Sequence, residues 1–394
     1  MIFSEELKAK VKSYIDSHRD EALAFWRDLV NCEGQDGELD ELMKTAGFLK
    51  DKMDEIGLDA EFIEVGAGHA PIVTGVLNPD APGKEMVFSG HYDTVFPAGS
   101  RGKDPFYIED GKAYGPGVCD MKGGITIAYF TVKALKEFGF KDLPVRLFFL
   151  GDEEVNHHNG KAIDYIKEYT NDILVDFNME NRYLTGELFI GRKGCYEYIV
   201  RTHGVKAHPG HKYDFGRSAI EEMAYKVIGL NGCTPKDPDR DFSVSVGTIT
   251  GGIGANVIPD FCECLIDVRI KSFAALEECE RRMREVCSKT VIDGTSTELI
   301  LKDPMPPFET TPEVMEAYGA VKAVSDAIGS TVSGTVFAGG ASDAAHIRKG
   351  TKVVCQCGVR GDYTHNEKEY ALVESLFEEI ELFIFVALNF ELFS

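Results

Sequence analysis

Three short apolar segments of this chain each end in polar residues that could bind a metal ion. Residues 86–89, 145–150 and 173–177 run into Gly90-His91-Tyr92-Asp93, Gly151-Asp152-Glu153-Glu154 and Asn178-Met179-Glu180, respectively. Segments of this length that are apolar almost throughout are typical of parallel strands buried on both faces. Because helical patterns lie between them, we predict an α/β domain with a mixed, mostly parallel sheet between helices. The polar clusters would then meet at the carboxyl edge of the sheet, where such folds bind ligands.

The N-terminal part of the chain has the periodicity of helices. Apolar residues recur at helical spacing from Leu7 to Ile15 and again from Phe25 to Leu29. Between them, residues 17–20 resemble a capping box, and the apolar residues after it continue in the same period. Another periodic pattern, 39–56, stops before Gly57, a residue that commonly ends helices. The apolar faces of these helices are expected to form part of the core.

The chain has 394 residues, more than one hydrophobic core usually serves, so we expect two domains. From residue 194 the pattern changes to strand, helix, strand, strand, helix, strand, at 196–202, 218–230, 242–250, 261–270, 273–286 and 297–301. This order predicts an inserted ferredoxin-like α+β domain, 194–305, within a catalytic domain made of 1–193 and 306–394. The proline-rich segment 303–307 is predicted to be a stiff linker. A helix at 312–328, strands near 335–337 and 352–355, and a last helix would complete the first domain.

Composition narrows the classes of partner. The formal net charge of −23 argues against nucleic acid, whose binding depends on clustered Lys and Arg. Residues 1–7 lack the apolar core of a signal peptide, and the apolar run 382–388 is too short to span a membrane and predicts a buried helix. Ten cysteines without a CxxC pair indicate free thiols in a reducing compartment. We therefore expect a cytoplasmic protein with a small-molecule substrate and neither nucleic acid nor membrane as partner.

A glycine-rich loop, Gly115-Pro116-Gly117-Val118-Cys119-Asp120-Met121-Lys122-Gly123-Gly124, presents a single carboxylate, Asp120, before a helical pattern. Glycines often only make a strand-to-helix turn, so the loop alone does not identify a site. The other candidate ligands are His91, Asp93, Glu153, Glu154, Glu180 and His365. Two histidines with several carboxylates and no thiolate suit Zn²⁺, with Co²⁺ or Mn²⁺ as substitutes. Two adjacent cations need a shared anionic ligand, and Asp120 is placed to bridge them.

Two further carboxylates have expected roles beside these ligands. Asp93, two residues after His91, can bind the other imidazole nitrogen and fix the tautomer. Zn²⁺ can lower the pKa of a bound water to near 7, but an amide nitrogen must also be protonated before it leaves. Glu153, next to the candidate ligand Glu154, can take the proton from the water and pass it on as general base. The alternative for His91 is a purely structural role, and the alternative for Glu153 and Glu154 is a solvated acidic loop.

Together these motifs resemble the signature blocks of the di-zinc exopeptidase family, which includes glutamate carboxypeptidases, aminoacylases and succinyl-diaminopimelate desuccinylases. The similarity is dense over 86–180 and continues more thinly through His208, Asn256-Val257-Ile258-Pro259, Asp267-Val268-Arg269 and His365. The resemblance implies two Zn²⁺ per subunit. Asp120 would bridge them, His91 and Glu180 would complete one site, and Glu154 and His365 would complete the other. It also implies Glu153 as the general base and a cis peptide between Asp120 and Met121.

The resemblance also implies that the protein is a homodimer and that the inserted domain serves as its lid and dimerisation domain. His208 matches the histidine that steadies the oxyanion of the tetrahedral intermediate, often from the partner subunit. Asn256 and Arg269 match positions that bind the substrate carboxylate or shape the site, although an Arg on a strand is commonly salt-bridged instead. The segment with Gly339 and Gly340 resembles a glycine-rich substrate loop, whose backbone N–H groups could hold a carboxylate.

One loop departs from the family pattern. After Glu154 the family usually continues with small residues, whereas this chain has Val155-Asn156-His157-His158-Asn159-Gly160. His157 and His158 are either extra ligands or part of an altered loop, and we favour the altered loop because the ligand set is already complete. Cys119 lies beside Asp120, but nothing in the sequence indicates that it is reactive.

These residues predict a zinc-dependent exopeptidase that cleaves an amide bond next to a free carboxylate. The first expectation is a carboxypeptidase or dipeptidase for small peptides, including those with C-terminal Glu, and the alternative is an N-acyl-amino-acid deacylase. A catalytically silent binding relative would have lost the base or a ligand, and this chain retains all of them. A two-metal phosphoesterase is disfavoured because no phosphate-binding loop is present.

Overall fold

The computed structural model describes residues 3–157, 160–330 and 332–394, so Met1, Ile2 and His158 lie outside the described residues. The chain divides into two compact units. The first, here called the sheet unit, contains 1–190, 310–336 and 342–394, and the second, the insertion unit, contains 191–309 and 337–341. The predicted second domain covered 194–305. The short segment 337–341, expected in the first domain, groups instead with the insertion unit.

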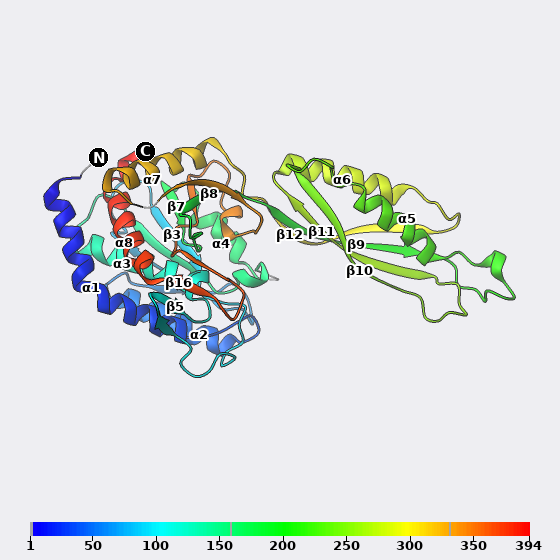
Figure 1. The fold of residues 1–394 in the computed structure, drawn as a ribbon, viewed down its shortest axis with the longest axis horizontal. Coiled ribbons are helices and arrows are strands. Elements are labelled where there is room, and N and C mark those ends of the chain that lie inside the picture. Colours follow the sequence, from blue (N-terminus) through cyan, green and yellow to red (C-terminus); the bar gives the residue numbers. More distant parts are fainter. Residues whose placement is uncertain (1–2, 158–159, 331) are drawn as a thin grey trace. The chain divides into compact units, whose positions relative to one another are not determined.

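The large sheet combines parallel and antiparallel strands (Figure 1). Its spatial order is β1 (Glu61–Ile63), β2 (Ile72–Leu77), β6 (Val145–Leu150), β3 (Met86–His91), β7 (Val175–Asn178), β14 (Val353–Cys355), β8 (Glu187–Arg192) and β13 (Gly334–Ala338). The central strands β6, β3, β7 and β14 run parallel, whereas β1, β2 and β8 pair antiparallel with their neighbours. The predicted mixed, mostly parallel sheet is confirmed, and its parallel centre carries the polar clusters at one edge.

Successive residues of the central strands enter different cores, as the alternation of side chains in a strand requires. On β6, Phe149 belongs to the main core while Phe148 packs in a smaller cluster with Ile166 of α4 (Ala162–Tyr169). The main core also contains the apolar faces of α1 (Glu5–Asn31), α2 (Leu39–Glu55), α3 (Gly123–Glu137), α7 (Pro312–Ile328) and α8 (Val373–Leu388). The sheet is therefore covered on both faces, as the strand composition predicted.

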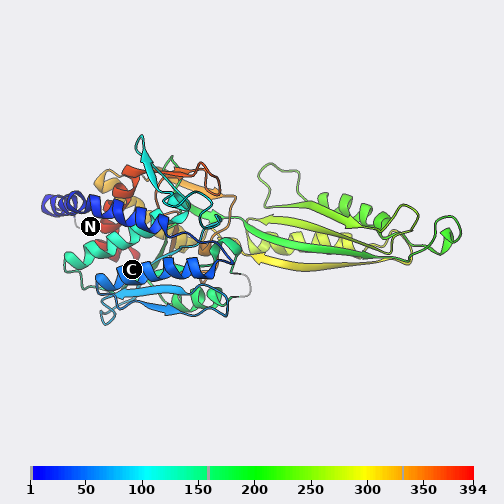
Figure 2. The ribbon, with the colours of Figure 1, turned by 90° about the horizontal axis from the view of Figure 1, so that it is seen from below.

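The N-terminal helix differs from its prediction. Helix α1 runs without a break from Glu5 to Asn31, and its N-cap is Ser4, whose side chain accepts a hydrogen bond from the N–H of Leu7 at 3.1 Å. The predicted capping box at 17–20 is wrong, because the hydroxyl of Ser17 donates to the carbonyl of Tyr14 inside the helix. The apolar stripe before and after Ser17 therefore belongs to a single helix. It packs against α8, and the first (blue) and last (red) helices lie in the same unit in both views (Figures 1 and 2).

The apolar run 382–388 lies within α8, and nearly all of it is buried, as predicted. Across the described ranges, no helix combines the length and the apolar character needed to cross a membrane.

A small sheet that the sequence did not reveal brings two distant loops together. Its order is β15 (Gly361–Asp362), β16 (Tyr370–Leu372), β5 (Lys112–Tyr114) and β4 (Tyr107–Glu109). The loop between β15 and β16 carries His365, and the glycine-rich loop with Asp120 follows β5 directly. Because β16 pairs antiparallel with β5, the end of the first loop lies beside the start of the second.

The insertion unit has its own antiparallel sheet and core. Its spatial order is β10 (Phe242–Gly251), β11 (Phe261–Ile270), β9 (Gly194–His203) and β12 (Ser296–Met305), and the helices are α5 (Ala219–Asn231) and α6 (Phe273–Ser288). Both helices share one apolar cluster with alternate residues of β9 and β11, so they cover one face of this sheet. Chain order and strand order together are those of the ferredoxin-like unit.

The predicted linker 303–307 is partly strand. Asp303 and Pro304 pair with Glu197 and Tyr196 as β12 continues to Met305. A proline fits here because β12 is an edge strand, where its missing N–H costs no ladder hydrogen bond. The linker prediction failed because it treated proline only as a strand breaker.

Candidate metal centre

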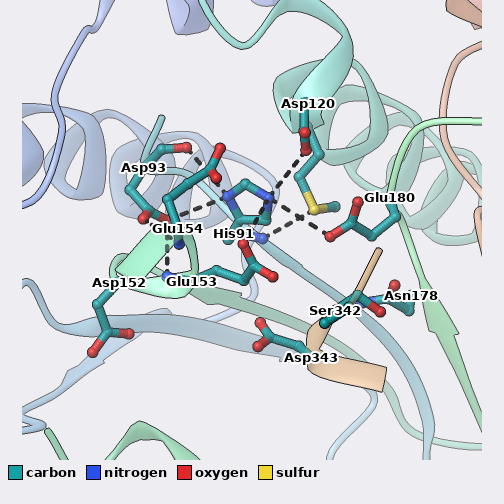
Figure 3. Close-up of polar contacts among 12 residues, drawn as sticks. His91, Asp93, Asp120, Asp152, Glu153, Glu154, Asn178, Glu180, Ser342 and Asp343 are labelled. Carbon is teal, nitrogen blue, oxygen red and sulfur yellow. Dashed lines mark hydrogen bonds and ion pairs between the residues drawn. The ribbon is translucent and has the colours of Figure 1, made fainter. Parts of the chain in front are cut away.

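The sheet unit brings the candidate ligands to one place from five separate segments. Figure 3 labels four of these ligands, His91, Asp120, Glu154 and Glu180. His91 is the last residue of β3, Glu154 lies in the short helix after β6, and Glu180 follows the end of β7. Asp120 and His365 come from the glycine-rich loop and from the loop between β15 and β16. The predicted meeting of polar residues at the carboxyl edge of the parallel strands is therefore found in the structure.

One group of side chains surrounds His91. Its Nε2 lies 3.3 Å from Oδ1 of Asp120 and 3.8 Å from Oε1 of Glu180. The three side chains offer ligand atoms that all lie within 4.8 Å of one another. His91 and Glu180 are buried, so the carboxylates and the imidazole face one another with little water between them.

A second group surrounds His365. Its Nε2 lies 3.1 Å from Oε2 of Glu154 and 3.4 Å from Oδ2 of Asp120. Asp120 thus turns one carboxylate oxygen toward His91 and the other toward His365. A carboxylate shared in this way is the arrangement that two neighbouring divalent cations require, because its negative charge offsets their mutual repulsion.

Glu153 lies beside these groups and belongs to neither of them. Its Oε2 is 3.8 Å from Nε2 of His91. Burial raises the pKa of Glu153 well above its ordinary range, and the negative charges of Asp343 and Glu180 add to the effect, while His91 opposes it. A carboxyl group with a raised pKa can both accept and return a proton near neutral pH.

Asp93 connects the end of β3, which carries His91, with the segment of Glu153 and Glu154. It is fully buried, and its Oδ1 lies 3.2 Å from Nδ1 of His91. The same carboxylate accepts hydrogen bonds from the backbone N–H groups of Glu153 and Glu154, at 3.3 and 3.0 Å. Asp93 therefore orients an imidazole and two carboxylate-bearing residues at once.

Glu369 supports the loop of Asp120 and was not identified from the sequence. Its carboxylate accepts hydrogen bonds from the backbone N–H groups of Gly117, Cys119 and Asp120, at 3.1, 2.8 and 3.0 Å. The side chain is fully buried, and burial together with the charge of Asp120 raises the pKa of Glu369 to about 7. In the sequence Glu369 belongs to the charged run 367–369, where no local pattern distinguishes it from a solvated residue.

The backbone of the glycine-rich loop has the special geometry that its composition suggests. Gly117 has φ +68°, a conformation that favours glycine. A Cβ at Gly124 would lie 1.8 Å from the carbonyl oxygen of Met179, so only glycine allows α3 to approach the end of β7. The peptide bond between Asp120 and Met121 is cis, as the family resemblance implied.

The charges of the residues fit divalent cations. Four carboxylates, those of Asp120, Glu153, Glu154 and Glu180, meet only two imidazoles. Although burial opposes it, hydrogen bonds to His365 and His91 lower the pKa of Asp120, and its carboxylate and that of Glu154 raise the pKa of His365 to about 11. Buried negative charge of this density needs compensating positive charge. Oxygen and imidazole nitrogen donors in this number are those that zinc takes.

Comparison with known proteins assigns the family. Residues 87–389 match the model of peptidase family M20/M25/M40, which is most of the chain. The chain belongs to this family. The resemblance inferred from the signature blocks is confirmed, and the protein is a metal-dependent hydrolase of the M20 type.

Relatives of this chain carry two kinds of name, carboxypeptidase and desuccinylase. Carboxypeptidase G2 of Pseudomonas sp. (strain RS-16) is 24% identical over 88% of this chain and 84% of its own length. Succinyl-diaminopimelate desuccinylase of Sulfurovum sp. (strain NBC37-1) is 27% identical over 76% of this chain and 82% of its own. A dinuclear metal-binding M20 peptidase from Bacillus subtilis has the same fold, with a TM-score of 0.69 at 16% identity over 95% of this chain and 98% of its own.

The remaining predicted residues of this M20 protein belong to the insertion unit. They are His208, Asn256, Arg269, Gly339 and Gly340. His208 is exposed, and its Nδ1 accepts a hydrogen bond from the N–H of Gly210. Asn256 is exposed between β10 and β11, and both glycines are exposed. Arg269 donates to both oxygens of Asp267 at 2.9 Å, which is the salt-bridged alternative weighed for it.

The loop after Glu154, which departs from the family pattern, places His157 in the interior. His157 is 2% exposed and lies between the carboxylates of Asp152 and Asp343. Cys119 is also buried, and burial raises the pKa of its thiol well above the ordinary range, so it is not a reactive thiolate. All cysteines of the chain fall in the described ranges and are thiols outside any disulfide, as expected.

Proposed function

We propose that this M20 protein is a two-zinc exopeptidase that cleaves an amide bond next to a free carboxylate in small peptides, including those with C-terminal Glu. The observation that carries the proposal is the position of Asp120, which shares its two oxygens between the group of His91 and the group of His365. His91 and Glu180 would hold one ion with Asp120, and Glu154 and His365 would hold the other. Zinc is the first choice because the donors are imidazole and carboxylate, with Co²⁺ or Mn²⁺ as substitutes.

The residues of the chain divide the work of the reaction. When bound, the metal pair polarises the amide carbonyl and makes a water molecule acidic enough to be a nucleophile near neutral pH. Glu153 accepts the proton of that water and returns it to the amide nitrogen, which then departs as an amine. Asp93 keeps the proton of His91 on Nδ1. The unprotonated Nε2, which faces Asp120, is then available to bind the metal.

The insertion unit is proposed to act as lid and dimerisation domain. Three apolar side chains on α5, those of Ile220, Tyr225 and Ile228, are exposed, Ile228 by 74%. Exposed apolar side chains of this size on one helix support an interface between two copies of the chain. We propose that His208 steadies the oxyanion, acting in the site of the partner subunit, and that Asn256 and the backbone of Gly339 and Gly340 contact the substrate carboxylate.

A second function, N-acyl-amino-acid deacylation, has specific support in the desuccinylase relatives. The metal groups and Glu153 would serve both reactions, since each cleaves an amide bond and releases a carboxylate-bearing amine. The free thiols and the acidic surface charge support a cytoplasmic location, where both kinds of small substrate occur.

The test is an assay of zinc-loaded protein against dipeptides, N-acyl amino acids and a phosphate monoester, with the Glu153→Gln variant as background. We expect hydrolysis of dipeptides, highest with C-terminal Glu, and none of the phosphate ester. Faster turnover of N-acyl amino acids than of any dipeptide would support the second function. Turnover of the phosphate ester alone, or equal rates in the Glu153→Gln variant, would overturn both.

A further inference from the structure

A separate cluster of buried titratable side chains lies close to Glu153. His157 places Nδ1 2.6 Å from Oδ1 of Asp152 and Nε2 2.6 Å from Oδ1 of Asp343. Asp152 and Asp343 both lie below Glu153 in Figure 3. His346, three residues after Asp343, completes the cluster, and its ring crosses that of His157 at 72° with the centroids 5.8 Å apart. None of these residues belongs to the groups around Asp120.

The cluster contains polar atoms that lack partners. Oδ2 of Asp343 and Nε2 of His346 are buried and make no hydrogen bond with any residue in the described part of the chain. Asp343 is 3% exposed and His346 is 6% exposed. An unpartnered buried donor or acceptor is costly, so such an atom commonly indicates a bound water or ion.

The charges of the cluster are also unbalanced. Asp152 and Asp343 contribute two buried carboxylates, and a proton shared with His157 supplies one positive charge. His346 makes no hydrogen bond to either carboxylate through its buried Nε2. A neutral imidazole has one nitrogen with a lone pair available to a cation. The ring of His69 reaches Oδ2 of Asp152 only at 3.9 Å and makes no hydrogen bond to it. A divalent cation would balance both carboxylates, whereas the proton on His157 balances one.

We propose that His157, Asp343 and His346 bind a third divalent metal ion. Their ligand atoms all lie within 4.8 Å of one another. On binding, Nε2 of His157 releases the proton that it shares with Asp343, while Nδ1–H stays on Asp152. A carboxylate on the far nitrogen of a metal-binding histidine is a recurrent arrangement. Two ligand atoms about 2.1 Å from a tetrahedral zinc ion are about 3.4 Å apart. Nε2 of His157 and Oδ1 of Asp343, now 2.6 Å apart, would therefore separate by roughly 0.8 Å if both bind the ion.

The third ion would have a structural role. His157 follows the segment that carries Glu153 and Glu154. Asp343 begins a short helix after β13, and His346 is the residue that caps its C-terminus. One ion bound to both segments would hold the general base in place without touching the substrate. This site shares no ligand with the proposed catalytic pair, so it stands or falls independently of the proposed function.

The test counts metal ions per chain. Protein stripped with a chelator is equilibrated with Zn²⁺, dialysed and analysed by atomic emission. We expect three ions in the wild type and two in the His346→Gln variant, with both proteins folded by circular dichroism. The His211→Ala variant, which removes an exposed histidine of the insertion unit, is the matched control and should keep three.

The decisive quantity is the difference of one ion between the wild type and His346→Gln, whatever the catalytic centre holds. Equal ratios in the two proteins would overturn the proposal. If His346→Gln does not fold, a variant with His91→Ala and His365→Ala decides instead. It lacks one ligand for each catalytic ion and should retain one ion, and a ratio of zero would overturn the third site.

Discussion

The carboxylate of Asp93 accepts a hydrogen bond from the backbone N–H of Glu154 at 3.0 Å, across 61 residues of sequence. The same carboxylate lies 3.2 Å from Nδ1 of His91. One buried side chain therefore sets the orientation of an imidazole at the end of β3 and the path of the loop after β6. We therefore expect metal affinity and the position of the proposed general base to depend on the same residue.

Replacing Asp93 with Asn should weaken metal binding about 10- to 100-fold, the usual cost of losing a carboxylate behind a histidine ligand. Asp93 uses one carboxylate oxygen for the N–H of Glu153 and the other for the N–H of Glu154. The Asn side chain has a single acceptor oxygen, so the loop should shift and kcat should fall as well. Competition with a chromophoric chelator measures the affinity. Unchanged affinity and kcat in the folded variant would contradict the role given to Asp93.

Glu153→Gln should leave metal content unchanged while kcat drops at least about 100-fold, because the amide cannot accept the proton of water. Metal analysis and steady-state kinetics on the same preparation test both parts. Glu61→Gln, at an exposed position on β1, is the matched control and should have wild-type kcat. A variant at Glu153 that keeps its turnover would remove this residue as the base.

Glu369→Gln should lower the free energy of unfolding by about 1–3 kcal/mol, since Gln offers one acceptor oxygen where Glu369 accepts three backbone N–H groups with two. The loop of Asp120 should loosen, and metal should dissociate faster. Urea denaturation of the metal-free proteins measures the stability. Glu367→Gln, exposed two residues earlier, should have no effect on stability or on metal release.

Asp176 should make stability depend on pH. Burial raises its pKa from 3.8 to about 8, although Ser89 donates a hydrogen bond to it, and the charge of Asp343 adds to the shift. Between these values the folded protein keeps a proton that the unfolded chain has lost. The free energy of unfolding therefore falls as pH rises, by at most about 1.4 kcal/mol per pH unit from this group, and the fall ends above pH 8.

The isosteric Asp176→Asn variant has no carboxyl group to ionise at this position. The difference between its free energy of unfolding and that of the wild type should therefore grow from pH 5 to pH 8 and then stay constant. Urea denaturation at several pH values measures it. Asp142→Asn, at an exposed position, should leave the wild-type pH dependence in place. A constant difference between Asp176→Asn and the wild type across this range would show that Asp176 is already ionised.

If His208 acts in the site of the partner subunit, subunits with His208→Ala and subunits with Glu153→Gln should complement each other. Random mixing gives heterodimers for half of the molecules, each with one intact site of two, so activity should return to about a quarter of the wild-type value. Differently tagged subunits allow the heterodimers to be purified. Inactive heterodimers of verified composition would exclude action across the dimer.

Much of the fold follows from local pattern. The bounds of β6 and α7 coincide with the predicted segments, and the strand and helix order of the insertion unit was predicted from periodicity. The failures have local causes too. Ser17 returns its hydrogen bond to Tyr14 and remains within α1, and Pro304 fits an edge strand. Propensity alone does not distinguish these cases, because the surrounding packing decides which alternative is more stable.

By itself, the sequence determined which residue types stand at the ends of the parallel strands, and with them the family and the candidate ligands. Only the tertiary structure revealed that Glu369 holds the loop of Asp120, about 250 residues away, and that His157 lies between Asp152 and Asp343. Periodicity reports which face of an element is buried. It carries no information on which distant loop meets that face, because that choice is made by the packing of the whole sheet unit.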